Sequence, residues 1–371
     1  MAESYGFNFI DFSQIHSLSS LHPLILRKGN SMHNPIEFIS DLKASPDIST
    51  DFPFFFYVFK KEKIVASVQT FPDLLFGEKE KYKWAWTADL LTDPNYRGQG
   101  AATCVWKNMV KILFEHDVFV GGAFANPITT HICRKMGFTI TNTAHRLLFL
   151  KSSMAFLSAH VKYKPISSLV DAIYRGSIYV LRRTILRTAS LTKSGYEIRK
   201  LDYCSFPEYN GFNKLCYGDR YHFDNSKDRI RWKLKSSKNL SFYVILEEAR
   251  KNPVLYLILK DRIVNNFAGR YSNFRLMTLM DFGFYSEGEK HLKTLLLVLE
   301  KLFWESSADV LEIVTSDPDV IRLAYRSGFV KAGRGVEFWF KAPRDRKLSV
   351  KCERIENWHF THFVSDAYSF Q

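Results

Sequence analysis

The sequence predicts an α/β fold in which two mixed sheets are each flanked by helices. Strand-like runs alternate with helical periodicity in both halves of the chain. The length of 371 residues is typical of two to three domains. The stretch from Asn126-Pro127 to Gly137-Phe138 also recurs with the same spacing from Asp317-Pro318 to Gly328-Phe329. This repeat predicts two copies of one domain.

The first half begins with apolar and aromatic runs separated by short polar turns, which indicate strands. After Asp93-Pro94-Asn95 the apolar positions recur three and four residues apart, which indicates a helix. Pro127 stands at a first-turn position and opens a second helix. The expected strands cover 54–60, 63–71, 83–91, 118–124 and 147–150, and the expected helices cover 99–116 and 127–137.

The second half restarts the same alternation after a segment without strand signals. Its expected strands cover 196–201, 242–246, 254–259, a run leading to 281–283, and 310–315, and its expected helices cover 227–236, 287–304 and 318–327. We therefore predict a first domain over 1–150, a connector over 151–193 and a second domain over 194–371.

The connector contains one predicted amphipathic helix over 166–187. Its apolar face carries Ile166, Val170, Ile173, Tyr174, Ile178, Leu181 and Ile185, and its opposite face carries Arg175, Arg182, Arg183 and Arg187. One hypothesis is that the apolar face packs on both domains. The other is peripheral membrane contact, with the arginines toward lipid phosphates.

Composition narrows the class of protein. The formal net charge of +14 favours polyanionic partners, and small polyanions or a membrane surface rank above nucleic acid because no nucleic-acid motif is present. The five cysteines form no C-x-x-C pair, which argues against a disulfide framework or a metal site and favours the cytoplasm. We also expect no signal peptide at the start of this sequence and no membrane-spanning helix.

The segment Tyr96-Arg97-Gly98-Gln99-Gly100-Ala101 lies between a predicted strand and a predicted helix. The first amides of a helix have no intrahelical partner and stand at the positive end of its dipole. Glycines leave room for a phosphate beside these amides, and Arg97 adds a cation. The segment therefore predicts a diphosphate cradle.

This segment resembles the R/Q-x-x-G-x-G/A acetyl-CoA signature of the GNAT N-acyltransferase family. Gly122-Ala-Phe-Ala-Asn-Pro, followed by Met136-Gly137-Phe138, resembles the next strand and the following helix end of that family. The resemblance covers about residues 54–140 and extends more weakly to the second half, as a tandem GNAT protein.

The resemblance implies direct transfer of an acyl group from acetyl-CoA or another acyl-CoA to an amine, without a covalent enzyme intermediate. The cofactor would lie in a V between the strand ending at Leu91 and the strand over 118–124. Backbone near Leu91 and Thr92 would bind the pantetheine arm and the thioester, and Asn126 would hold the splayed strand or the pantetheine. The implied cofactor residues are Leu91, Thr92, Arg97, Gly98, Gln99, Gly100, Ala101, Ala102 and Asn126.

The catalytic groups are less clearly marked. The family's general acid is a Tyr four residues before the Gly of the Gly-Phe pair, and Cys133 stands there in this chain. Cys133 is a candidate acid, and a buried helical cysteine is the alternative. Asp89 is the candidate base, and a solvent-facing carboxylate is the alternative.

The second domain departs from the signature. The repeat aligns the cradle with Gly288-Glu289-Lys290-His291, where Glu289 would repel a diphosphate. We therefore predict a degenerate copy that does not bind CoA and instead shapes an acceptor cleft or supports the first domain. His222, and His362 with Asp366 in the C-terminal segment, are additional polar candidates for that cleft. For the segment that contains His359, His362 and Asp366, the alternative is core packing together with ordinary solvent-facing polar residues.

The acceptor predicted by analogy is an amine of a small molecule, bound between the domains. Two alternatives remain. One is a non-catalytic acyl-CoA sensor, because the family's Tyr is missing. The other is a Fem-type aminoacyl transferase, which has two similar halves but does not need the cradle at Arg97–Gly100.

Overall fold

The computed structural model describes most of both predicted domains. The described residues are 5–11, 13–14, 27–28, 31–32, 51–123, 127–152, 169–174, 176–177, 195–201, 217–236, 239–249, 252–264, 274–285, 289–333, 335–344, 348 and 350–361.

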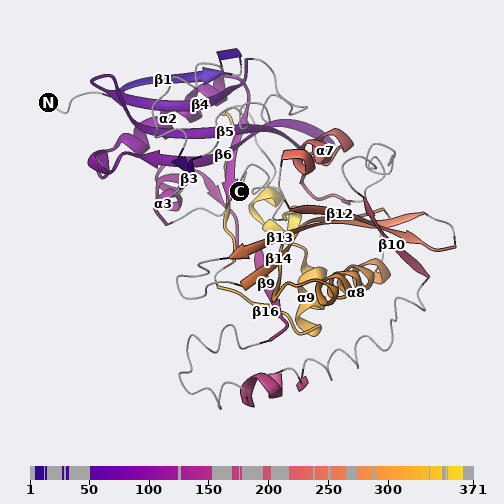
Figure 1. The fold of residues 1–371 in the computed structure, drawn as a ribbon. Helices are drawn as coiled ribbons and strands as arrows, with labels where there is room; N and C mark the ends of the chain where they lie inside the picture. Colours follow the sequence, from indigo (N-terminus) through magenta and orange to yellow (C-terminus); the bar gives the residue numbers. More distant parts are fainter. Residues whose placement is uncertain are drawn as a thin grey trace.

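Two large mixed sheets form the molecule, and a small ladder pairs β2 (Arg27–Lys28) with β3 (Ser31–Met32) (Figure 1). The path of the first large sheet is β1 (Gly6–Asp11), β4 (Pro53–Lys60), β5 (Lys63–Gly77), β6 (Glu80–Thr92), β7 (Phe119–Ala123), β17 (Phe338–Lys341) and β8 (Thr139–Ile140), with β11 (His222–Phe223) also paired to β5. The second is β10 (Tyr196–Leu201), β12 (Leu240–Glu247), β13 (Pro253–Val264), β14 (Phe274–Phe284), β15 (Val310–Thr315), β9 (His145–Leu150) and β16 (Val330–Lys331).

Helices follow the strands at the same places in both sheets. The described helices are α2 (Ala101–Glu115), α3 (Pro127–Lys135), α7 (Lys227–Ser236), α8 (Glu289–Glu305) and α9 (Pro318–Arg326), and the short 3-10 turns are η2 (Pro94–Tyr96), η5 (Val350–Glu353) and η6 (Ile355–Asn357). Helices α2 and α8 each connect two parallel neighbours, β6 with β7 and β14 with β15. The structure thus confirms the predicted tandem architecture.

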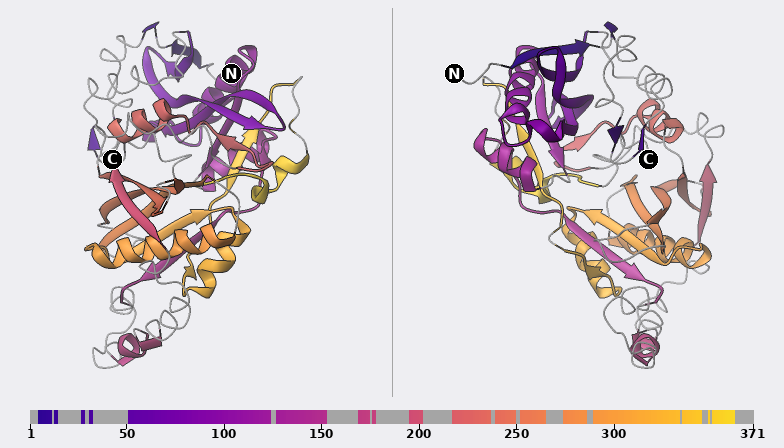
Figure 2. Two further views of the ribbon diagram at one scale, coloured as in Figure 1. Left: turned by 90° about the vertical axis from the view of Figure 1, so that its right-hand side faces the viewer. Right: turned by 60° about the vertical axis from the view of Figure 1, so that its left-hand side comes forward.

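The two halves contribute strands to each other's sheets. Strand β9 comes from the first predicted domain but pairs with β15 and β16, and β17 comes from the second but pairs with β7 and β8. Figures 1 and 2 show the yellow β17 beside the purple strands and the purple β9 beside the orange ones. The predicted domain boundaries at 150 and 194 stay a prediction. They do not separate the two sheets, because each sheet contains strands from both predicted domains.

A buried charge anchors the exchanged strand β9. Glu312 on β15 is fully buried. It forms an ion pair with Arg146 on β9, lies 3.6 Å from Arg262 Nη2 on β13 and accepts a hydrogen bond from Thr278 Oγ1 at 3.1 Å. These contacts join the four strands β13, β14, β15 and β9 through one carboxylate and fix β9 in the second sheet.

The described part of the connector has both exposed and packed residues on its predicted apolar face. Residues 169–174 are helical, and Val170 and Ile173 of that face are 40% and 61% exposed. Tyr174 of the same face packs against the cluster that contains Leu148 and Leu150, and its hydroxyl donates to the carbonyl of Leu150 at 3.4 Å. The polar Asp171 is also buried and accepts a hydrogen bond from Ser152 Oγ at 2.8 Å. Apart from 169–174 and 176–177, the predicted helix over 166–187, including its four arginines, lies outside the described residues.

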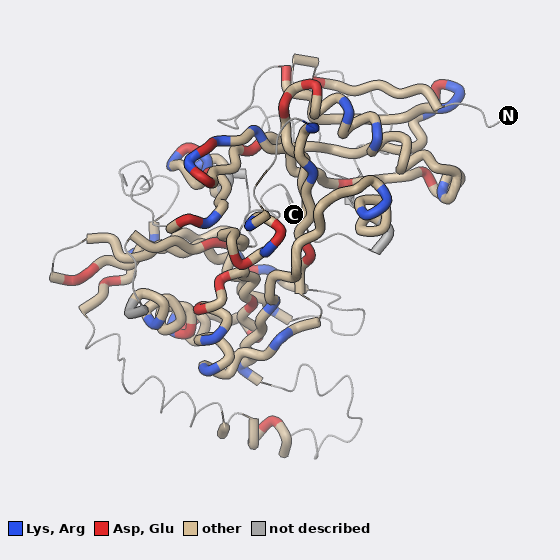
Figure 3. Tube along the Cα trace, turned by 180° about the vertical axis from the view of Figure 1, so that it is seen from behind, with Lys and Arg blue, Asp and Glu red and all other residues tan. Residues whose placement is uncertain are grey.

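Charges of both signs are interspersed over the described elements of the two halves (Figure 3). None of the described helices is long and apolar enough to span a membrane.

A buried ion pair connects the halves. Arg229 on α7 and Asp73 on β5 have fully buried side chains, with Arg229 Nη2 3.2 Å from Asp73 Oδ2. Arg229 also donates to the carbonyl of Pro72 at 2.9 Å, and Trp86 Nε1 donates to Asp73 at 3.0 Å. Removal of one partner would leave the other charge buried without compensation.

We therefore expect Arg229→Met to lower the free energy of unfolding by about 3–5 kcal/mol. The matched control is Arg199→Met, because Arg199 pairs with Glu197 on an exposed surface; its cost should stay below about 1 kcal/mol. Urea denaturation of the full chain measures both. Equal losses in the two variants would contradict the assigned role of the buried pair.

Candidate functional site

The predicted cradle lies at the N-terminus of α2. After β6 ends at Thr92, the η2 turn leads to Gly98 and Gly100, which have φ angles of +74° and +88°. Such angles are costly for residues with a Cβ atom, so glycine is required here by conformation. A Cβ built on either glycine meets no atom within 4 Å, which leaves open space in front of the first amides of α2.

The turn before the cradle is fixed by Asp93. Its carboxylate accepts a hydrogen bond from the backbone N–H of Asn95 at 2.9 Å and lies 2.8 Å from Lys63 Nζ. The hydrogen bond and charge of Asp93 raise the pKa of Lys63. Gln99 Nε2 donates a hydrogen bond to the carbonyl of Asn95 at 2.8 Å, so this side chain stabilises the turn. Arg97 is exposed beside it.

The sheet opens next to the cradle. Parallel pairing between β6 and β7 ends at Trp86 and Gly121, whereas β7 stays paired with β17 as far as Ala123. The β6 arm continues on β5 through Leu91 and Thr92, both half-buried. We call the V-shaped opening between these two strands the first splay. The family resemblance implies that the pantetheine arm of the cofactor binds there.

Consecutive glycines shape the β7 arm. A Cβ on Gly121 would lie 2.0 Å from Trp84, and one on Gly122 would lie 2.2 Å from Trp339 and 2.9 Å from Thr87 Oγ1. Only glycine lets the two indoles approach β7 this closely. The Thr87 hydroxyl donates to the carbonyl of Gly121 at 3.2 Å, at the point where the arms separate.

Asp89 lies on the β6 arm at a bulge, where the β5–β6 register shifts between Ser67 and Gln69. Its φ of +49° is unusual for a residue with a side chain. The carboxylate is half-buried and has no hydrogen-bond or ion-pair partner among the described residues. Strain and a free polar group together are typical of a functional position.

Cys133 lies elsewhere. Its side chain is fully buried in the apolar core between α2 and the sheet, near Trp106 and Phe138. Burial raises the pKa of its thiol to about 12. A proton donor must reach the leaving thiolate, and a thiol enclosed by this core does not meet that requirement, so the structure favours the alternative of a buried helical cysteine.

Of the other predicted cofactor residues, Ala101 is buried and Ala102 half-buried in the first turn of α2. Asn126 lies outside the described residues, as do His362 and Asp366. His222 is half-buried, with its ring 4.1 Å from that of Tyr217 and 5.3 Å from that of Phe76, and burial lowers its pKa to about 4. The described residues contain no group of His, Cys, Asp or Glu that could hold a metal ion.

Gln69 was missed by the sequence interpretation. It is 6% exposed, and its Oε1 is buried with no hydrogen-bond partner in the described part of the chain. Gln69 pairs with Ala88 and Phe55, so its side chain shares their sheet face, which is directed toward the second domain. The only sequence signal was one amide inside an apolar strand.

The burial of Cys133 gives a direct test. At pH about 8 the Cys133 thiol should resist iodoacetamide because its pKa is about 12, whereas the half-buried Cys104 should react faster. Peptide mass spectrometry after labelling resolves the two sites. Rapid labelling of Cys133 in the folded protein would restore it as a candidate acid.

Comparisons with known proteins bear on this geometry. Residues 19–138 match the acetyltransferase (GNAT) family. No curated protein matches the chain. A probable N-acyltransferase from Enterococcus faecalis V583 has a similar structure, with 12% identity, 92% of this chain and 73% of that chain covered, and a TM-score of 0.57.

Two other solved structures have the same fold. A tandem GNAT protein from the clavulanic acid biosynthesis pathway is 13% identical, with 93% of this chain and 100% of that chain covered and a TM-score of 0.51. Saccharomyces cerevisiae N-myristoyltransferase with bound myristoyl-CoA is 11% identical, with 97% and 90% covered and a TM-score of 0.53. Residues 19–138 therefore match the acetyltransferase (GNAT) family, within a chain that has the two-sheet fold of tandem GNAT proteins.

Proposed function

We propose that the protein is an N-acyltransferase that moves an acyl group from acyl-CoA, such as acetyl-CoA, to the amine of a small-molecule acceptor. The observation that carries this proposal is the open cradle at Gly98 and Gly100, placed directly beside the splay of β6 and β7. A phosphate site and a strand gap next to each other suit a ligand that has a diphosphate at one end and a linear arm at the other.

The described residues fit such a cofactor. Amides from Gly98 to Ala102 would bind the diphosphate, with Arg97 beside them. The backbone edge of the β6 arm that faces β7, near Leu91 and Thr92, would bind the pantetheine arm. From the family resemblance, we propose that Asn126 assists this binding. The thioester carbonyl would then lie within the splay, where the acceptor reaches it.

The proposed reaction is a direct transfer. The neutral amine attacks the thioester carbonyl, the C–N bond forms and the C–S bond breaks, which gives an amide and the thiolate of CoA. The ammonium proton leaves to Asp89, directly or through a water molecule, and the thiolate takes up a proton. Asp89 is suited to this because it stands on the β6 arm and has no hydrogen-bond or ion-pair partner in the part of the chain that the structure describes.

The acceptor is proposed to enter from the face between the two sheets. Gln69 presents its unpaired oxygen on this face, one strand away from the Asp89 bulge. A buried unpaired acceptor costs stability, and such groups are commonly satisfied by a ligand donor. An N–H of the acceptor would satisfy Gln69.

The missing family Tyr and the buried thiol of Cys133 favour one alternative, a non-catalytic acyl-CoA sensor. Assays of the full chain with acetyl-CoA and longer acyl-CoAs against a panel of amines separate the two functions. A fragment over 1–150 would be unsuitable for this test because it lacks β17, which pairs with β7.

We expect Gly100→Glu to abolish acyl-CoA binding, because a side chain and a negative charge enter the cradle at a φ of +88°. Gly333→Glu is the matched control, since Gly333 also has a positive φ of +61° and open space around it. Isothermal calorimetry measures binding. Unchanged affinity in Gly100→Glu would remove the basis of the proposed cofactor site.

Asp89→Asn should lower turnover by about 10²-fold or more while acyl-CoA affinity stays the same. Steady-state kinetics with the acceptor found in the panel measures turnover, and calorimetry measures acyl-CoA affinity. Retention of turnover in Asp89→Asn would exclude Asp89 as the base.

Gln69→Leu should raise the free energy of unfolding by about 1 kcal/mol or more, because it removes a buried unpaired carbonyl. At the same time it should raise the KM for the acceptor and leave acyl-CoA affinity unchanged. Thermal denaturation and kinetics with the amine found in the panel check the two effects. A loss of stability with an unchanged KM would show that Gln69 has only a structural role.

A further inference from the structure

The second sheet contains a splay like the first. Parallel pairing between β14 and β15 ends at Leu279 and Ile313, whereas β15 stays paired with β9 as far as Thr315 and His145. In the first sheet, β7 likewise continues on β17 beyond the end of its pairing with β6. Both sheets therefore separate at the same topological position.

In the second splay the opening is filled by the chain itself. Thr315 forms an antiparallel bridge with Thr361. Because His145 takes the other edge of Thr315, Thr361 must lie on the edge that faces β14. No described residue takes the corresponding edge of Ala123 in the first splay.

The residue after β15 holds the same segment. The Ser316 hydroxyl donates to the carbonyl of Trp358 and accepts from the backbone N–H of Phe360 at 3.1 Å. The backbone N–H of Ser316 donates to the carbonyl of Phe360 at 3.3 Å. These bonds attach Trp358–Thr361, the plug, to the β15 arm.

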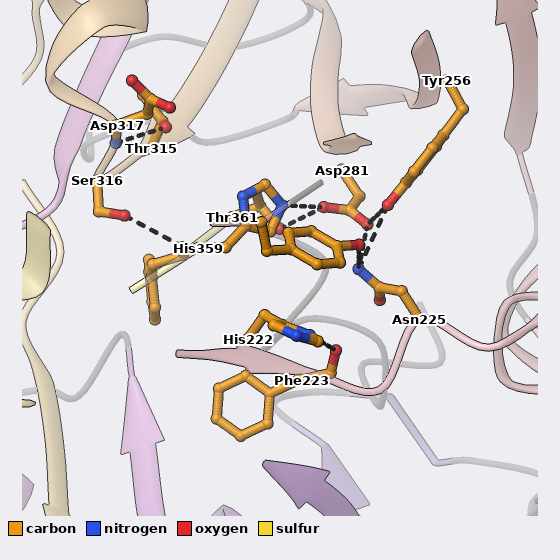
Figure 4. Close-up of polar contacts among 12 residues, drawn as sticks. His222, Phe223, Asn225, Tyr256, Asp281, Thr315, Ser316, Asp317, His359 and Thr361 are labelled. Atoms are coloured by element: carbon orange, nitrogen blue, oxygen red, sulfur yellow. Dashed lines mark hydrogen bonds and ion pairs between the residues drawn. The ribbon is translucent and has the colours of Figure 1, made fainter. Parts of the chain in front are cut away.

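The opposite arm holds the plug through Asp281 on β14, which is 1% exposed. Thr361 Oγ1 donates to Asp281 at 2.9 Å, and His359 Nε2 lies 3.4 Å from the same oxygen (Figure 4). Tyr256 donates to the other carboxylate oxygen at 2.7 Å, and Asn225 lies 3.3 Å from it. The plug thus spans the splay from one arm to the other.

We infer that Trp358–Thr361 permanently occupies the second splay, in the position that the first splay leaves open, so that the second domain binds a segment of its own chain in place of acyl-CoA. The start of α8 agrees with this. Residues 289–291, which the repeat aligns with the cradle, are already helical and form no turn like that at Gly98–Gly100. The inference rests on the proposed function only where it names acyl-CoA as the ligand of the first splay.

The plug also supports the first splay. The rings of Trp358 and Phe360 lie 4.8 Å and 5.5 Å from that of Phe338 on β17. Phe338 pairs with Ala123, at the end of the β7 arm. His359 points the other way, toward Asp281 and Phe282. The filled splay therefore packs against β17, the strand on which β7 stays paired after it leaves β6.

Hydrogen exchange on the full chain tests the plug without any ligand. Amides of 358–361 should be protected, and Ser316→Ala should raise their exchange rate by about tenfold or more, because it removes a donor and an acceptor of the plug. The control is Ser306→Ala, since Ser306 bonds to Phe303 at the end of α8, away from the plug. Fast exchange of 358–361 in the unmodified protein, or no change in Ser316→Ala, would overturn the inference.

Calorimetry with acetyl-CoA tests whether the plug keeps acyl-CoA out of the second splay. We expect one site in the unmodified chain and none in Gly100→Glu, with no rise in the exchange of 358–361 when acetyl-CoA is added. A second acetyl-CoA site in the unmodified chain, or a plug whose exchange rises with acetyl-CoA, would overturn the inference. Absence of binding in both proteins would contradict the proposed function instead. The hydrogen-exchange experiment would then test occupancy of the second splay by the plug independently.

Discussion

The rest of the structure depends on one constraint, which is that β7 stays paired with β17 beyond the point where its pairing with β6 ends. A strand that gives up one neighbour must stay hydrogen-bonded on its other edge, because buried backbone groups without partners are costly. Strand β7 leaves β6 after Gly121 and remains on β17 as far as Ala123. The opening beside the cradle therefore exists because a distant part of the chain supplies β17.

The same constraint explains why the halves are joined so closely. Each sheet is completed by a strand of the other half, and the buried carboxylates of Glu312 and Asp73 fix neighbouring elements across this exchange. The two splays then differ in what fills them. The second is closed by its own chain at Asp281 and Thr315, whereas no described residue fills the first, which opens toward the cradle.

Local sequence patterns predicted much of the fold. The strand–turn–helix context and the paired glycines predicted the turn before α2, whose role as a diphosphate cradle stays a prediction. Apolar spacing predicted helices α2, α8 and α9. The exchange of β9 and β17 was not predictable in this way, because pairing between residues far apart leaves no local periodicity. The strand over 147–150 was found, but its place in the second sheet depends on Arg146 meeting Glu312. Gln69 and Arg229 were missed because sequence does not reveal which polar residues are buried.

Amide hydrogen exchange with and without acetyl-CoA tests the central claim, that one open splay beside one cradle forms the ligand site. New protection is expected at the start of α2, from Gly98 to Thr103, and along the β6 arm near Leu91 and Thr92. No new protection is expected at the start of α8 or at Asp281. Protection at α8 and β14, with none at α2, would contradict the account.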